Sequence, residues 1–301
     1  MALPHHHSRP QSRAGSRRMS VDPRNELHHT VDHYIGIDVG TGSARACIMN
    51  ADGDIVGLHS ENIGLWQPQT GYYVCSLQHR FTAEHEHLLR PLQEQSTSDI
   101  WHCICTSIRL AMQQHNIDPS SVRGLGFDAT CSLAVFREDT DAPQCVTGPY
   151  FDNQDGNDRN VILWLDHRPV EETAKINATK HNLLRYVGGT MSIEMEIPKV
   201  LWLKNNMPKE MFDKCKFYDL ADALTHLATG RENRSLCSVT CKQGYVPVGV
   251  DGSVKGWQED FLTDIGLPDL CEDNFRRMGG VNRVVSLFLL SILCMALVNT
   301  R

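Results

Sequence analysis

The residues best suited to chemistry gather around a glycine-rich turn at residues 38–45. The turn reads Asp38-Val39-Gly40-Thr41-Gly42-Ser43-Ala44-Arg45. Backbone N–H groups, two hydroxyls and a guanidinium at one turn favour the binding of a phosphate group. Asp38 is suited to hold Mg²⁺ directly or through water, because that ion keeps several waters and takes few carboxylates. The turn therefore predicts a nucleotide-phosphate site.

Apolar runs on both sides of the turn predict two strands that position it. Val and Ile are frequent in these runs, and a third strand is expected over residues 54–60. We expect Asp38 to be a buried carboxylate at the end of the first strand. A purely structural hairpin is the alternative, since Asp and Gly are common in turns and the lysine of a G-x-x-x-x-G-K-[ST] loop is absent. The three-stranded meander resembles the start of the ATPase fold that actin, hexokinases, Hsp70 chaperones and sugar kinases share.

The composition is that of an ordinary globular protein with one or two domains. The chain has 301 residues, 41% of them hydrophobic, and a net charge of −7. This charge gives no general attraction to nucleic acid or to anionic membranes. Eleven cysteines without a CxxC pair suit reduced thiols, so a cytoplasmic location is expected. Residues 1–30 are expected to be a disordered basic tail, with a transit peptide as the alternative.

Helices and strands alternate along the rest of the chain. Strands are predicted over residues 122–127, 133–136 and 161–165, and helices over residues 99–116, 171–186, 199–206 and 219–229. Ser98 or Asp99 would cap the first helix, and Pro198 suits the first position of the third. Gly230 would end the last helix. This order predicts an α/β protein.

Four segments in order resemble the FGGY family of carbohydrate kinases, in its ribulokinase-like branch. They are the turn at residues 38–45, residues 124–132 (GLGFDATCS), residues 163–168 (LWLDHR) and residues 198–203 (PKVLWL). The resemblance runs from about Tyr34 to Gly280 and covers only the amino-terminal lobe of the family. It implies an α/β lobe of the actin-like (ribonuclease H-like) ATPase fold, with a mixed sheet flanked by helices and the second lobe missing.

The resemblance implies a role for each matching position. Residues expected to bind phosphate and magnesium are Asp38, Gly40, Thr41, Gly42, Ser43 and Arg45, with Asp38 as the metal ligand. Residues expected to bind the sugar are Asp128, Ala129, Thr130, Asp166, His167 and Lys199. The implied cofactors are ATP and Mg²⁺, and the implied substrate is a ketopentose such as ribulose. No catalytic residue is assigned, because the base is expected in the second lobe.

The chemistry of these residues agrees with a sugar site, although each has a simpler explanation. A polyol needs several donors and acceptors, because each hydroxyl taken from water must regain a hydrogen bond. As alternatives, Asp128 and Asp166 would cap turns, and Lys199 would be an ordinary solvated lysine. His167 would donate to a backbone carbonyl.

Two segments depart from the family pattern. Residues 71–92 are expected to be a solvated insertion within a kinase domain at residues 31–280. Their Glu-His-Glu-His run at 84–87 lacks the i, i+4 histidine pair of a helical zinc site. Residues 281–301 are expected to be a non-family apolar tail, interpreted as translation of a retained intron or as the product of a mispredicted gene model. Its apolar run, residues 284–298, is shorter than the ~20 residues that span a bilayer, so a membrane anchor is the lesser alternative.

Without a second lobe, we expect little or no kinase activity from this chain. A general base contributes roughly 10²–10⁴ in rate, and closure of the cleft contributes further. The alternative function is a non-catalytic fragment that binds sugar, or that pairs as a homodimer or with full-length kinase. A peptide-stimulated ATPase of the Hsp70 or actin type is a third hypothesis. The segments at residues 124–132 and 163–168 argue against it, because they suit a small polar ligand.

Overall fold

The computed structural model describes residues 31–67, 92–152 and 158–285. The chain divides into two units, residues 1–30 and residues 31–301, and all described residues belong to the second. The expectations for the basic tail, for nearly all of the insertion, including its Glu-His-Glu-His run, and for residues 286–301 lie outside the described residues.

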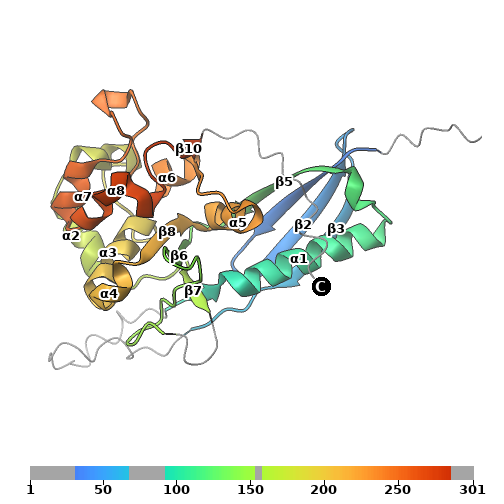
Figure 1. Ribbon diagram of the computed structural model, residues 1–301, viewed down its shortest axis with the longest axis horizontal. Helices are drawn as coiled ribbons and strands as arrows, with labels where there is room; N and C mark the ends of the chain where they lie inside the picture. The colour runs from blue at the N-terminus through green and yellow to red at the C-terminus, as the bar shows by residue number, and fades with distance from the viewer. Residues whose placement is uncertain (1–30, 68–91, 153–157, 286–301) are drawn as a thin grey trace, which may run out of the picture. The chain divides into compact units, whose positions relative to one another are not determined.

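The first sheet carries the predicted meander. Its four strands lie in the order β3-β2-β1-β5, with β1 spanning His33–Val39, β2 Ser43–Asn50, β3 Ile55–Asn62 and β5 Val122–Ala129. The meander is antiparallel, whereas β5 runs parallel to β1, so the sheet is mixed. Helix α1 (Thr97–Gln114) packs along β2 and β3 and covers one face of this sheet (Figure 1). The three strands predicted around the glycine turn are confirmed.

The expectation that Asp38 is buried is wrong. Its side chain is 53% exposed. Successive side chains of a strand point to opposite faces, and Ile37 and Val39 on either side of Asp38 are buried in the core. Asp38 must therefore lie on the other face of the sheet.

The second sheet separates two hydrophobic cores. Its strands lie in the order β4-β7-β6-β8, all antiparallel, with β4 spanning Glu94–Ser96, β6 Leu133–Arg137, β7 Arg159–Ile162 and β8 Cys215–Asp219. Along β6, Leu133 and Val135 enter one core, and Ala134 and Phe136 enter the other. Both faces of this sheet are thus covered. The sequence predicted β6 and placed β7 slightly too late, and it missed the short strand β4 and the strand β8.

The helix ends follow local capping chemistry, and they correct two expectations. Ser96 caps α1, because its hydroxyl accepts from the N–H groups of Ser98 and Asp99. The single helix expected over residues 171–186 is divided into α2 (Val170–Ala178) and a 3₁₀ turn (Asn182–Val187). Lys180 lies between them with a φ of 52°, a left-handed value that a continuing α-helix does not allow.

The remaining helices complete the two cores, with α3 in the larger one and α5 in the smaller one. Helix α3 spans Glu196–Asn206, so Pro198 occupies its third position, where the first turn still tolerates proline. Helix α5 spans Leu220–Thr229 and ends at Gly230 with a φ of 66°, as predicted. The other elements are α4 (Lys209–Phe212), β9 (Arg234–Ser235), α6 (Leu236–Lys242), α7 (Glu259–Ile265), α8 (Glu272–Phe275) and β10 (Val284–Val285). None of the helices within the described ranges is long and apolar enough to cross a bilayer.

Replacing Ser96 by Ala tests the corrected cap. We expect Ser96→Ala to destabilise the protein by about 1 kcal/mol, because two N–H groups of α1 lose their acceptor. The melting temperature should fall by roughly 2–4 °C. Ser98→Ala is the matched control, since Ser98 is exposed and caps nothing. A larger effect of Ser98→Ala than of Ser96→Ala in thermal unfolding would contradict this assignment.

Candidate functional site

Three predicted site residues form a row across the first sheet. In the pairing of β1 with β2, Asp38 lies opposite Arg45, and in the pairing of β1 with β5 it lies opposite Asp128. Residues directly opposite in neighbouring strands share a face. Arg45 Nη1 donates to Asp38 Oδ2 over 2.6 Å, and all three side chains are exposed. Two carboxylates and one guanidinium are therefore presented together beside the glycine turn.

The glycine turn is held by contacts from other segments. The N–H of Gly40 donates to the Ser43 carbonyl over 2.9 Å and closes the turn, and the Gly42 carbonyl accepts from the Ile63 N–H. The Thr41 carbonyl accepts from Gln95 Nε2 over 2.7 Å. The N–H groups of Thr41 and Gly42 find no acceptor among the residues that the structure describes. Fixed N–H groups of this kind suit an anion.

Hydrogen bonds tie the sugar-site segments to this turn. Trp164 Nε1 donates to the Thr41 hydroxyl over 3.2 Å, and the Thr130 N–H donates to the Val39 carbonyl over 3.0 Å. Lys199 Nζ donates to the Leu163 carbonyl over 2.6 Å and to the Glu194 carbonyl over 3.1 Å. The four segments that resemble the kinase family therefore meet in one region.

Asp166 lies beneath this region, in a buried ion network. It is completely buried, and Arg168 donates to its carboxylate from Nε over 2.9 Å and from Nη2 over 2.5 Å. The N–H of Gln93 donates to it over 2.7 Å. Burial alone would raise the pKa of Asp166, but the charge and hydrogen bonds of Arg168 hold that pKa below its usual value. Asp166 is thus an ionised group that orients the segment at residues 163–168.

Lys199 is also completely buried, which excludes the alternative of a solvated lysine. Burial lowers the pKa of Lys199 to about 8, since the ammonium loses its hydration. Two of its three N–H groups donate to the carbonyls named above, and the described residues supply no acceptor for the third. It holds the first turn of α3 against the segment at residue 163.

The other predicted residues lie closer to solvent. Asp128 is exposed, and its Oδ1 accepts from the N–H of Ala129 over 3.0 Å. The hydroxyl of Thr130 lies 3.1 Å from that of Ser132. His167 and Thr130 are half-buried. The predicted residues thus fall into an exposed layer around Asp38 and Asp128 and a buried layer around Asp166 and Lys199.

Sequence reasoning missed two residues that support the site. Gln95 fixes the Thr41 carbonyl, and Glu94 accepts from Arg168 Nη2 over 2.9 Å, with both side chains almost fully buried. They lie on the short strand β4, which carries no alternating pattern. The one available signal was a pair of polar residues directly before a helix start.

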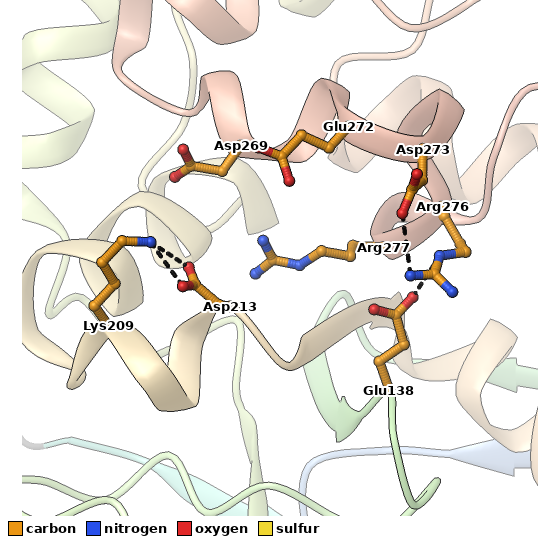
Figure 2. Close-up of a pocket in the computed structure, with 8 residues that line it drawn as sticks. All are labelled: Glu138, Lys209, Asp213, Asp269, Glu272, Asp273, Arg276 and Arg277. Atoms are coloured by element: carbon orange, nitrogen blue, oxygen red, sulfur yellow. Dashed lines mark hydrogen bonds and ion pairs between the residues drawn. The ribbon is translucent and has the colours of Figure 1, made fainter.

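Two other polar clusters are weaker candidates. A cavity of about 200 Å³ is lined only by charged residues, and none of the predicted site residues is among them. They are Glu138, Lys209, Asp213, Asp269, Glu272, Asp273, Arg276 and Arg277. Figure 2 shows Arg277 extending between Asp213 and Asp269, while Lys209 and Arg276 are paired with carboxylates of the wall. Most of this cavity's charges are therefore already compensated by one another.

The second cluster places Asp141, His226 and Glu232 close enough together to hold a metal ion. Lys216 Nζ, however, lies 2.5 Å from Asp141 Oδ1 and 2.8 Å from Glu232 Oε1. The ammonium group thus already supplies the cation that these carboxylates need. This cluster is an ion network rather than a metal centre.

Comparisons with solved structures give the class of the fold. A gluconate kinase from Lactobacillus acidophilus aligns with a TM-score of 0.57 at 18% identity, over 79% of this chain and 40% of that one. A xylulose kinase from the same organism aligns with a TM-score of 0.56 at 18% identity, over 78% and 40%. The mixed sheet with flanking helices is therefore a lobe of the actin-like ATPase fold found in sugar kinases.

Sequence comparisons then give the family. Residues 74–241 match the N-terminal domain of the FGGY family of carbohydrate kinases. The chain belongs to the FGGY family of carbohydrate kinases, which confirms the resemblance in the sequence. The turn at residues 38–45 precedes the matched residues.

Curated relatives place the chain beside the ribulokinases. A D-ribulokinase of Saccharomyces cerevisiae is 44% identical over 263 residues, which are 87% of this chain and 33% of that protein. An FGGY carbohydrate kinase domain-containing protein of Homo sapiens is 41% identical over 249 residues, 82% of this chain and 39% of that protein. The chain thus spans between a third and two fifths of the length of these two relatives.

Proposed function

We propose that this chain supplies the phosphate- and sugar-binding part of an ATP-dependent kinase for a ketopentose such as ribulose. The observation that carries the proposal is the row of Asp128, Asp38 and Arg45 beside a turn that is bonded to Trp164. This arrangement places a turn suited to bind an anion next to polar groups suited to bind sugar hydroxyls. The similarity to a D-ribulokinase supports the choice of sugar.

The residues of the turn fit magnesium and the phosphates of ATP. Asp38 is an exposed carboxylate, and the N–H groups of Thr41 and Gly42 beside it have no acceptor within residues 31–67, 92–152 and 158–285. Asp38 would hold the ion directly or through water, and Ser43 and Arg45 would donate to phosphate. Gly40 would keep the turn closed, because its N–H donates to the Ser43 carbonyl. Magnesium supplies neutralisation of phosphate charge, on which phosphoryl transfer depends.

The exposed and the buried layers of predicted residues would have different roles in sugar binding. Asp128, Ala129, Thr130 and His167 would face the sugar hydroxyls, because they lie at or near the surface. Asp166 and Lys199 would act as positioning residues from below, since both are completely buried. Preorganised polar groups of this kind lower the cost of orienting a bound substrate. The nine described cysteines are free thiols, which supports a reducing compartment such as the cytoplasm.

Sugar binding without phosphoryl transfer is the second candidate. It is favoured by one observation: Asp128 and Thr130 present polar groups suited to sugar hydroxyls at or near the surface. In this case the chain would bind the sugar alone, as a homodimer, or together with a full-length kinase.

One experiment distinguishes the two candidates. Purified residues 1–301 are incubated with Mg²⁺-ATP and a panel of ketopentoses, and both ADP release and thermal protection are measured. Ketopentose-dependent ADP release that Asp38→Ala abolishes supports the kinase. Thermal protection by sugar without ADP release supports the binding protein. Neither signal, in a sample that circular dichroism shows to be folded, would contradict both.

A further inference from the structure

A buried carboxyl pair lies directly behind the candidate sugar site. Glu196 begins α3, and Asp219 ends β8; both side chains are completely buried, and they are neighbours. Glu196 lies one helical turn before Lys199, so the two share a face of α3. We propose that Glu196 is a positioning residue of the candidate sugar site that stays protonated at neutral pH and donates a hydrogen bond to Asp219. Its link to a sugar site rests on the proposed function.

The hydrogen bonds around the pair show which carboxyl holds the proton. Asp219 accepts from Lys242 Nζ and from the Ser238 hydroxyl, each over 2.8 Å. Glu196 Oε2 accepts only from the neutral amide of Gln243, over 2.5 Å, and its Oε1 receives no donor from the described residues. Lys242 is bonded to Asp219 and Lys199 to two carbonyls, so an ionised Glu196 would be a buried charge that no cation among the described residues bonds, which is strongly unfavourable. A proton on Glu196 Oε1 removes that charge and provides a donor to Asp219.

The electrostatic surroundings agree with this assignment. Burial and the neighbouring Asp219 raise the pKa of Glu196 well above its usual value, although Lys242 lowers it in part. Burial and Asp219 also raise the pKa of Asp222, to about 7. If Glu196 were ionised, its charge would also raise the pKa of the Lys199 ammonium and of the Cys131 thiol.

A neutral Glu196 keeps Lys199 in its observed place. The ammonium of Lys199 is held by the carbonyls of Leu163 and Glu194, and the Glu194 carbonyl also accepts from the Cys131 thiol over 3.7 Å. An ionised Glu196 on the same helix face would attract Lys199 away from these carbonyls. That movement would separate α3 from the loops at residues 131 and 163, which line the candidate site.

Infrared spectroscopy of Glu196→Gln tests the protonation directly. At neutral pH, the difference spectrum against wild type should show loss of a protonated carboxyl C=O band. Glu232→Gln is the matched control: hydrogen bonds from Lys216 and Tyr218 outweigh burial and lower the pKa of Glu232 to about 2, so this variant should lose ionised carboxylate bands. Loss of ionised carboxylate bands in Glu196→Gln would overturn the proposal. So would misfolding of this variant, because an amide has the shape and charge of a neutral carboxyl.

The pH dependence of stability gives a second test. A carboxyl with a raised pKa in the folded state stabilises fully below its unfolded value of about 4.3, and this stability is lost as pH rises. Glu196→Gln has no proton to lose. Its melting temperature relative to wild type should therefore rise by about 2 °C or more between pH 5 and pH 8. For Glu232→Gln, the same difference should stay nearly constant, because the pKa of Glu232 lies below this range in the folded and unfolded states. A flat profile for Glu196→Gln as well would contradict the proposal.

A sugar-binding measurement distinguishes failure of this inference from failure of the proposed function, on which its link to a sugar site rests. Glu196→Leu, which removes the donor to Asp219, should bind a ketopentose at least tenfold more weakly than wild type, and Glu196→Gln, which keeps a neutral donor, should restore binding to within about threefold of wild type. Absence of ketopentose binding by wild type would contradict the proposed function, and the infrared result would still decide the protonation of Glu196. Wild-type affinity in a folded Glu196→Leu, or an equal loss in Glu196→Leu and Glu196→Gln, would overturn the positioning role.

Discussion

Arg168→Ala is expected to destabilise the protein by about 3–5 kcal/mol. Arg168 is the cation between two completely buried carboxylates, Asp166 and Glu94, and its own side chain is 2% exposed. Its guanidinium also lies over the ring of Trp202, 4.9 Å from the centroid. Removing it takes away the cation that bonds both buried carboxylates, and such a loss costs far more for buried charges than for exposed ones.

Urea denaturation of Arg168→Ala and of a control measures this effect. Arg137→Ala is the control, because Arg137 forms an ion pair with the exposed Asp139 at the protein surface. Exposed pairs contribute little to stability, so this variant should unfold nearly as wild type does. Equal unfolding midpoints for the two variants would show that the network around Arg168 is not a source of stability.

Asp38→Ala is expected to weaken Mg²⁺-dependent binding of ATP by about 10–100-fold. The carboxylate would hold the magnesium ion directly or through water, and no other carboxylate than Asp128 shares its row on the sheet. The variant also frees Arg45, whose guanidinium bonds Asp38 in the structure. Binding of ATP without magnesium should therefore weaken less, or even strengthen.

Calorimetric titration with ATP, in the presence and absence of magnesium, measures these affinities. Asp52→Ala is the matched control, since it removes one exposed carboxylate from the turn at the opposite end of β2. It should leave both affinities unchanged. An equal loss in the two variants would mean that overall charge, and not the site at Asp38, determines binding.

Local patterns predicted the elements that position the site. Each of these elements is specified by a few neighbouring residues, so it could be predicted from the sequence. They are the alternating apolar residues of β1 and β2, the glycine turn between them and the Gly230 end of α5. The burial of Asp38 was mispredicted because its exposure depends on which face α1 covers. Which face α1 covers is decided by packing between segments far apart in the sequence, such as Ser107 of α1 and Ala44 of β2, which are 63 residues apart.

The buried layer of the site could not be predicted for the same reason. Arg168 reaches Glu94 across 74 positions of the sequence, and Gln243 reaches Glu196 across 47. No local pattern distinguishes these polar residues from solvated ones. The motif at residues 163–168 identified Asp166 as important, but only the fold shows that it is a buried, ion-paired group.

Calorimetric titration of folded residues 1–301 with ribulose and other ketopentoses tests the central claim most directly, namely that the turn and the sugar segments form one site. The account predicts that one ketopentose binds, that Asp128→Ala weakens this binding at least tenfold, and that Asp52→Ala leaves it unchanged. No binding by folded wild type, or equal binding by Asp128→Ala, would contradict it.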